Sequence, residues 1–276
     1  MTTNPSTSRL FIFGYGHIGA ALADLARAAG YAISATARTA DKRQSLESAG
    51  IEAVDPADPE ALRQAATADA MLITPAPDDD GCPAFTALSG LSTLPSWVGY
   101  LSTTGVYGDR GGGWVFEDSE LRPNSTEGRR RVVAEQQWLS RDAQVFRLPG
   151  LYGADRNVLM RLRDGTARRV DKPGHVFSRL HHDDCATALM ASLSRPRPGG
   201  IYNLCDDEPA SPDDVLVFGA ELIGLPLPGF TEITPAMARF YADNKRVSNA
   251  LAKAELGWSL RYPTYREGLS ALYASQ

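Results

Sequence analysis

Short apolar runs alternate with longer amphipathic stretches through the first half of the chain. The runs expected to form strands are suited to β structure and cover residues 10–13, 32–37, 51–54, 70–74, 98–102 and 145–148. The segments expected to form helices carry helical spacing or capping residues and cover 18–29, 41–49, 59–68, 84–91 and 126–140. Strands that alternate with helices in this way predict βαβ units and a parallel sheet.

The pattern becomes irregular beyond residue 150, where elements are shorter and Pro and Gly are more frequent. One further buried strand is expected at 201–204, and helices are expected at 212–224 and 247–256. This contrast predicts a regular first domain followed by a smaller, looser lobe.

The glycine-rich segment GYGHIG at residues 14–19 follows the first predicted strand and opens the first predicted helix. A second strand follows within about thirty residues, which is the context that makes GxGxxG a dinucleotide-binding pattern. Gly14 would permit the tight turn, Gly16 would let backbone approach a pyrophosphate, and Gly19 would let helix pack on strand. The helix N-terminus would face the phosphates with free N–H groups.

Arg38 closes the second strand, where an acidic side chain would favour NAD by binding the ribose 2′-hydroxyl. A guanidinium can instead bind a 2′-phosphate, worth about ten- to a hundredfold in affinity. Thr36 and Thr39 are nearby hydroxyl donors, and Lys42 and Arg43 follow closely. NADP is therefore the preferred cofactor and NAD the weaker alternative, although a solvated arginine at a strand end is the competing interpretation.

Composition fits a soluble globular protein: 276 residues, 43% apolar and 22% charged, with a net charge of −5. The acidity argues against nucleic acid as a partner, and no apolar run approaches a membrane span. Residues 1–8 form a short polar tail without a signal-peptide core. Cys82, Cys185 and Cys205 are widely spaced and odd in number, which predicts a reducing cytoplasm.

Several further segments occur in a telling order: STTGVYG at 102–108, RLPGLYG at 147–153, RLHHDDCA at 179–186, IYNLCDDEP at 201–209 and ELGW at 255–258. Together with GYGHIG, this order resembles the extended short-chain dehydrogenases/reductases, and among them the atypical, epimerase-like members. The resemblance implies an α/β fold with a doubly wound parallel Rossmann sheet at 9–150, to which 179–204 return. It implies a smaller C-terminal substrate lobe made of 151–178 and 205–276.

The same resemblance assigns roles position by position. The pyrophosphate turn would include Tyr15, His17 and Ile18, and Asp55 would bind the adenine. The remaining cofactor contacts would be Thr74, Pro75 and Ala76 along the dinucleotide, with Pro149, Gly150 and Leu151 near the nicotinamide. Thr103 stands where the family places its catalytic Ser or Thr, so its hydroxyl would polarise a substrate oxygen.

The chain departs from the family at the catalytic Tyr-x-x-x-Lys. Counting from Glu135 puts Glu127 in the Tyr position and Arg131 in the Lys position. A Glu, with an unperturbed pKa of ~4.3, is ionised at neutral pH and cannot donate a proton as a tuned Tyr does. Arg131 could hold a ribose hydroxyl or a phosphate, but it does not shuttle protons. Either the site has decayed to a solvated helix start, or it is rewired around Thr103 with Tyr107, Glu127 or a water handling protons.

Adjacent His181 and His182 precede two aspartates, but neighbours on an extended segment point to opposite faces, so no metal site is expected. Two functions remain open. The first is an NADP-dependent oxidoreductase or epimerase acting on a small carbonyl, alcohol or sugar-nucleotide substrate. The second is an NADP-binding protein with little turnover that senses redox state or binds a partner. The sequence leaves a monomer and a homodimer equally open.

Overall fold

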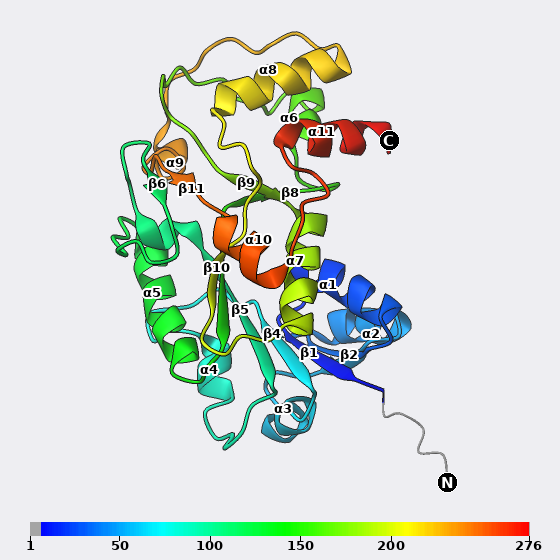
Figure 1. Cartoon of the computed structure of the whole chain (residues 1–276). Helices are drawn as coiled ribbons and strands as arrows, with labels where there is room; N and C mark the ends of the chain where they lie inside the picture. The colour runs from blue at the N-terminus through cyan, green and yellow to red at the C-terminus, as the bar shows by residue number, and fades with distance from the viewer. Residues whose placement is uncertain (1–6, 276) are drawn as a thin grey trace. The chain divides into compact units, whose positions relative to one another are not determined.

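The computed structural model describes residues 7–275, so residues 1–6 of the predicted polar tail lie outside the described part. Seven strands form a parallel sheet in the order β10-β7-β5-β4-β1-β2-β3 (Figure 1). Their bounds are β1 (Arg9–Phe13), β2 (Ala32–Thr36), β3 (Glu52–Val54), β4 (Ala70–Ile73), β5 (Trp97–Thr103), β7 (Gln144–Leu148) and β10 (Ile201–Asn203). The order reverses between β1 and β4, which is the switch point where doubly wound sheets bind ligands. The predicted α/β fold class is confirmed.

The chain divides into two compact units, each built from three segments. The first unit contains the residues up to 102 together with 130–146 and 186–201, and the second contains 103–129, 147–185 and 202–276. Four stretches that the sequence assigns to the first domain group with the second unit in this division: 103–129, 147–150, 179–185 and 202–204. For the longest of them, 103–129, the reason is long-range pairing, because β6 (Trp114–Val115) pairs with β11 (Arg246–Val247).

The first unit owes its core to apolar strands and to helices with one buried face. Buried side chains from β1, β4, β5 and α5 meet there, among them Phe11, Met71, Tyr100 and Trp138. The helices associated with the central sheet are α1 (His17–Ala28), α2 (Ala40–Ser48), α3 (Pro59–Ala65), α4 (Pro83–Ala87), α5 (Thr126–Leu139) and α7 (His182–Ser194). The helix expected at 84–91 is shorter than predicted and ends at Ala87.

The second unit has a core of its own, formed mainly where α6, α8 and α11 pack together (Figure 1). Its elements are η1 (Thr104–Tyr107), β8 (Gly150–Tyr152), α6 (Val158–Arg163), β9 (Arg179–His181), α8 (Pro212–Ile223), α9 (Pro235–Ala238), α10 (Ala250–Leu256) and α11 (Tyr265–Ala274), besides β6 and β11. The continuous helix expected at 247–256 is wrong at its start. Val247 lies in β11 instead, with its N–H bonded to the Ser178 hydroxyl at 3.1 Å.

The part of the chain from 7 to 275 contains neither a membrane-spanning helix nor a disulfide. No helix there is both long enough and apolar enough to cross a bilayer. The three cysteines are buried free thiols. Burial raises the pKa of the thiols of Cys185 and Cys205, which makes both poor nucleophiles.

A buried polar chain ties α7 to two strands of the first unit. The Trp97 indole N–H donates to the Ser192 hydroxyl at 3.0 Å, and that hydroxyl donates to the Gln144 side-chain oxygen at 2.8 Å. All three side chains lie within the core, with Ser192 fully buried. Each group is therefore satisfied only while the serine is present.

We expect Ser192→Ala to lower the free energy of unfolding by about 1–3 kcal/mol, because it leaves a buried donor and a buried acceptor without partners. Urea denaturation measures the change. Ser194→Ala is the matched control, since that hydroxyl is exposed on the same helix, and it should change stability by less than about 0.5 kcal/mol. Equal effects of the two substitutions would contradict this account.

Candidate functional site

The turn after β1 is fixed by hydroxyls from the two neighbouring strands. The Gly14 N–H donates to the Thr36 hydroxyl at 2.8 Å, and the Gly14 carbonyl accepts from the Thr74 hydroxyl at 2.5 Å. Gly14 has a φ of +92°, and a Cβ there would lie 2.4 Å from the Thr74 hydroxyl oxygen. Both the backbone conformation and the space around it therefore require glycine at this position.

Gly16 and Gly19 differ in whether the surrounding structure requires glycine. A Cβ on Gly19 would lie 3.1 Å from the Ile12 side chain, so helix α1 packs closely on β1 here. Gly16 has a φ of −117°, which any residue can adopt, and nothing lies within 4 Å of a Cβ built on it. The protein's own packing thus explains Gly14 and Gly19 but not Gly16.

Helix α1 begins at His17 with an open N-terminus. Gly16 is its N-cap and offers no capping side chain, and the first turn carries no acidic residue. Backbone N–H groups at such an end attract an anion, helped by the helix dipole. Tyr15 is half-buried and His17 exposed beside the turn, whereas Ile18 is buried in the core. The turn therefore has the features of a phosphate cradle.

The residues after β2 have separate roles. The Thr36 hydroxyl is buried and accepts the Gly14 N–H, whereas Thr39, the N-cap of α2, is exposed and accepts the Lys42 N–H, so its own O–H stays available. Arg43 donates to the carbonyls of Ala37 and Arg38 and pairs with Asp55 at 3.1 Å. The exposed guanidinium of Arg38 has no hydrogen bond or ion pair within residues 7–275.

Asp55 is predicted to bind adenine, and its carboxylate already has internal partners. One oxygen accepts from the Ala57 N–H at 2.9 Å, and the other faces Arg43. These contacts fix the carboxylate at the end of β3 and leave it half-exposed. Thr74, Pro75 and Ala76 follow β4, beside the Gly14 turn across the switch point.

Arg131 is held by the ends of β4 and β5 rather than solvated. Its guanidinium donates to the Leu101 carbonyl at 2.6 Å, to the Tyr100 hydroxyl at 2.9 Å and to the Pro75 carbonyl at 3.4 Å. Four residues on, buried Glu135 accepts a hydrogen bond from the Ser102 hydroxyl at 2.5 Å. Two side chains of α5 thus contact the carboxyl end of β5, in the helix register assumed from the sequence.

The second unit contains a cavity of about 670 Å³ that gathers several predicted site residues. Thr103, Glu127, Pro149 and Gly150 line it, whereas Leu151 is not among its lining residues. Glu127 is exposed and pairs with Arg239 at 2.7 Å.

Tyr107 lies outside this cavity, in the core of the second unit. Its ring is fully buried, and its hydroxyl donates to Asn203 at 2.7 Å and accepts from Arg147 at 2.9 Å. Burial raises the pKa of Tyr107 to about 12, an effect that the neighbouring Arg147 only partly offsets. The geometry favours a structural role and disfavours Tyr107 as a proton donor.

Sequence reasoning missed three side chains that line the same cavity: Ser178, Asp243 and Lys245. Lys245 is only 8% exposed, and burial lowers the pKa of its ammonium. Its Nζ donates to Asp243 at 2.8 Å and to the Gly108 carbonyl at 3.0 Å. These residues come from segments far from Thr103 in sequence, and no local pattern marks them.

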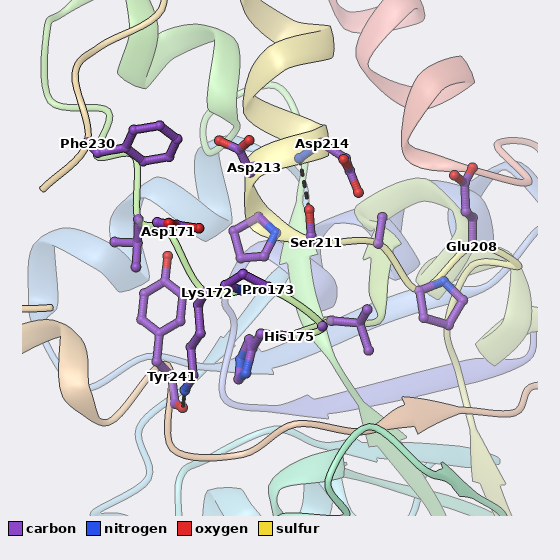
Figure 2. A pocket seen from close by; sticks show the side chains of 16 residues that line it. Asp171, Lys172, Pro173, His175, Glu208, Ser211, Asp213, Asp214, Phe230 and Tyr241 are labelled. Carbon is purple, nitrogen blue, oxygen red and sulfur yellow. Dashed lines mark hydrogen bonds between the residues drawn. The ribbon is translucent and has the colours of Figure 1, made fainter. Parts of the chain in front are cut away.

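A second cavity, of about 400 Å³, lies next to the start of α8 (Figure 2). His175 lies near Lys172 and Tyr241 there, is 2% exposed, and has no partner for either ring nitrogen among the described residues. Burial lowers the pKa of His175, and Lys172 lowers it further. Asp213 on the cavity wall is already paired with Arg169 at 2.6 Å.

The segment RLHHDDCA at 179–186 contains β9 and the start of α7. Fully buried Asp184 accepts from the backbone N–H groups of Arg261 and Tyr262, at 2.6 and 3.0 Å. Among residues 7–275, no group of three or more His, Cys, Asp or Glu side chains could hold a metal ion.

Comparisons with solved structures match the whole chain. A conserved protein of unknown function from Silicibacter pomeroyi is 43% identical, with a TM-score of 0.91, over 98% of this chain and 99% of that chain. A candidate NAD-dependent epimerase/dehydratase from Methylobacillus flagellatus is 25% identical, with a TM-score of 0.74, over 98% and 99% of the two chains. A dTDP-glucose 4,6-dehydratase from Bacillus anthracis in complex with NAD is 18% identical, with a TM-score of 0.75 over 97% of each chain, and shows a shared fold.

One curated relative is a 3-diazoavenalumate denitrifying reductase from a Streptomyces species, 27% identical over 156 residues. The match covers 50% of this chain and 51% of that relative, so the chain spans about half the length of the curated protein it matches. No family model matches the chain.

The open space at Gly16 generates a prediction. Gly16→Val should fold normally, because the backbone conformation suits valine and no atom obstructs it, yet it should abolish binding of NADPH and NADH. Fluorescence titration measures binding, and thermal unfolding checks the fold. Gly14→Val is the contrast, since it should destabilise the turn itself. A folded Gly16→Val protein that still binds either cofactor would refute the phosphate cradle.

Proposed function

This chain belongs to the extended short-chain dehydrogenase/reductase family, among its epimerase/dehydratase-like members, and on that basis we propose that it is an NADP-dependent oxidoreductase or epimerase. The first unit would bind the dinucleotide, and the second would bind a small carbonyl, alcohol or sugar-nucleotide substrate. When bound, the nicotinamide would supply or accept the hydride. The reductase among its relatives supports this class of reaction.

The observation that carries the proposal is the contrast among the three glycines of the turn. Internal contacts account for Gly14 and Gly19, whereas Gly16 faces empty space beside the open N-terminus of α1. A pyrophosphate over Gly16 would fill that space and accept hydrogen bonds from backbone N–H groups of the first helical turn. The residues present therefore fit the phosphates of a dinucleotide.

NADP is proposed over NAD because of Arg38. Thr36 is buried and Arg43 has internal partners, so exposed Arg38 at the end of β2 is the group proposed to bind a 2′-phosphate, with the exposed side chains of Thr39 and Lys42 close behind it in the chain. No acidic residue closes β2 to bind a free 2′-hydroxyl. Two structural relatives were solved with NAD bound. Arg38 is the reason for proposing NADP, and not NAD, for this chain.

The Thr103 hydroxyl is proposed to bind the reacting oxygen of the substrate. Thr103 lines the cavity, and its oxygen accepts the Gly105 N–H at 3.1 Å, which leaves the O–H free to donate. Glu127 is proposed as an ion-paired wall residue rather than the proton donor, because its exposed carboxylate already binds the Arg239 guanidinium. A water molecule would then carry the proton that Tyr delivers in the ordinary family mechanism.

A binding protein with little turnover is the second candidate. It is favoured by Arg131, whose guanidinium is engaged by three internal acceptors in the position of the family's catalytic lysine. In that case NADPH would bind tightly while no carbonyl substrate is reduced. The protein would then use the bound cofactor to sense redox state or to control binding of a partner.

We expect Arg38→Ala to weaken NADPH binding by about ten- to a hundredfold and to leave NADH binding nearly unchanged. The loss follows from removal of the charge-assisted hydrogen bonds to the 2′-phosphate. Titration of both cofactors measures it, with Arg27→Ala on the far end of α1 as a control. Equal losses for the two cofactors would overturn the NADP assignment.

The catalytic assignment predicts slow hydride transfer that depends on Thr103 and not on Glu127. Thr103→Ala should slow single-turnover oxidation of NADPH by about a hundredfold or more, the usual effect of losing one donor to a developing oxyanion. Glu127→Gln should change the rate by less than about threefold, within the range expected of an exposed wall residue.

Stopped-flow absorbance of the nicotinamide with a panel of aldehydes and ketones provides the rates, and Thr126→Ala is the matched control on the same helix start. A large loss in Glu127→Gln would instead assign the proton transfer to Glu127. Tight NADPH binding with no transfer to any substrate would support the binding protein.

A further inference from the structure

Three hydroxyls of the Thr103 cavity have an acceptor position filled by backbone. The pairs are Gly105 N–H to Thr103 at 3.1 Å, Gly128 N–H to Ser125 at 2.9 Å and Val247 N–H to Ser178 at 3.1 Å. A hydroxyl that accepts in this way keeps its own O–H for donation. None of the three donates to another group in the part of the chain that the structure describes.

Lys245 adds a charged donor to the same wall. Its ammonium has three N–H bonds, and within residues 7–275 it donates to the Gly108 carbonyl at 3.0 Å and to Asp243 at 2.8 Å. The side chain is nine-tenths buried and lines the cavity. One N–H therefore remains for a ligand, and a buried ammonium gains more from an anionic partner than an exposed one does.

The two carboxylates of this cavity, Asp243 and Glu127, already have partners and do not accept hydrogen bonds from the three hydroxyls. Asp243 is shared by Lys245 and by the Asn124 side-chain N–H, which donates to it at 3.0 Å. Glu127 is paired with Arg239. The cavity thus has more hydrogen-bond donors available to a ligand, the three hydroxyls and one N–H of Lys245, than available acceptors. Its apolar wall consists of Val176, Phe177 and Phe240.

We infer that this cavity recognises an oxyanion, so that its substrate is a small carbonyl compound bearing a carboxylate or a phosphate. Lys245 would bind the anionic oxygen, and Thr103, Ser125 and Ser178 would donate to the remaining oxygens. The apolar wall would contact the body of the substrate. This inference rests on the proposed function and names the substrate class of its pocket.

Calorimetry with matched anionic and neutral ligands tests the inference. The carboxylate pair is benzoylformate and its methyl ester, and the phosphate pair is dihydroxyacetone phosphate and dihydroxyacetone. We expect at least one anion to bind about tenfold or more tightly than its neutral analogue, in protein saturated with NADPH. The pair that shows the preference identifies the oxyanion as carboxylate or phosphate.

Two substitutions attribute the preference to Lys245. Lys245→Met should weaken the preferred anion by about ten- to a hundredfold and leave the neutral analogue unchanged. Asp243→Asn should tighten the anion several-fold, because the ammonium loses its internal carboxylate, whereas a merely structural role predicts no gain. Lys253→Met is the control, since that lysine pairs with Asp207 outside the cavity and should have no effect.

Two results would overturn the inference. One is equal affinity for the anion and its neutral analogue in both pairs. The other is an unchanged or weakened anion affinity in Asp243→Asn, a variant that decides the question even where Lys245→Met does not fold. The same titrations without NADPH, beside a titration of NADPH alone, separate failure of this inference from failure of the proposed function.

Discussion

The hydrogen bonds that hold Gly14 from both sides are the constraint on which the candidate nucleotide site depends. The Thr36 hydroxyl at the end of β2 accepts the Gly14 N–H, and the Thr74 hydroxyl just after β4 donates to the Gly14 carbonyl. Both bonds lie at the point where the strand order reverses. The turn is therefore fixed by the sheet itself, and α1 must leave it in one direction. The close approach of Gly19 to Ile12 then sets the depth of the helix against β1. These contacts set the direction in which the backbone N–H groups of the first turn of α1 point.

Much of the first unit could be predicted from the sequence because its signals are local. Apolar strands bounded by capping residues gave β1, β2, β4 and β5 to within about a residue, and α5 to within one residue. The glycine turn was equally visible, since its three glycines act within six positions. Glu135 set the register of the α5 helix. Its buried hydrogen bond from the Ser102 hydroxyl explains why Glu135 is a reliable reference position.

The second unit was less predictable because distant contacts define it. β6 and β11 have two residues each and exist only through pairing with one another, so 246–247 could not be separated from a helical pattern. The cavity wall combines Thr103, Ser178 and Lys245, and nothing in the sequence around Lys245 marks it as buried. Helix α11 begins with a local signal, the capping box formed by Thr264 and Glu267, so its start is predictable from the sequence.

Arg43 has an effect beyond the contacts it makes. By joining the carbonyls at the end of β2 to Asp55 at the end of β3, it immobilises the backbone that carries Arg38 before any ligand arrives. The conformational entropy of ordering this strand end is thus lost during folding and not during association. A ligand that contacted Arg38 would therefore restrain a side chain on backbone that is already ordered, and such preorganisation favours a small entropic penalty on binding.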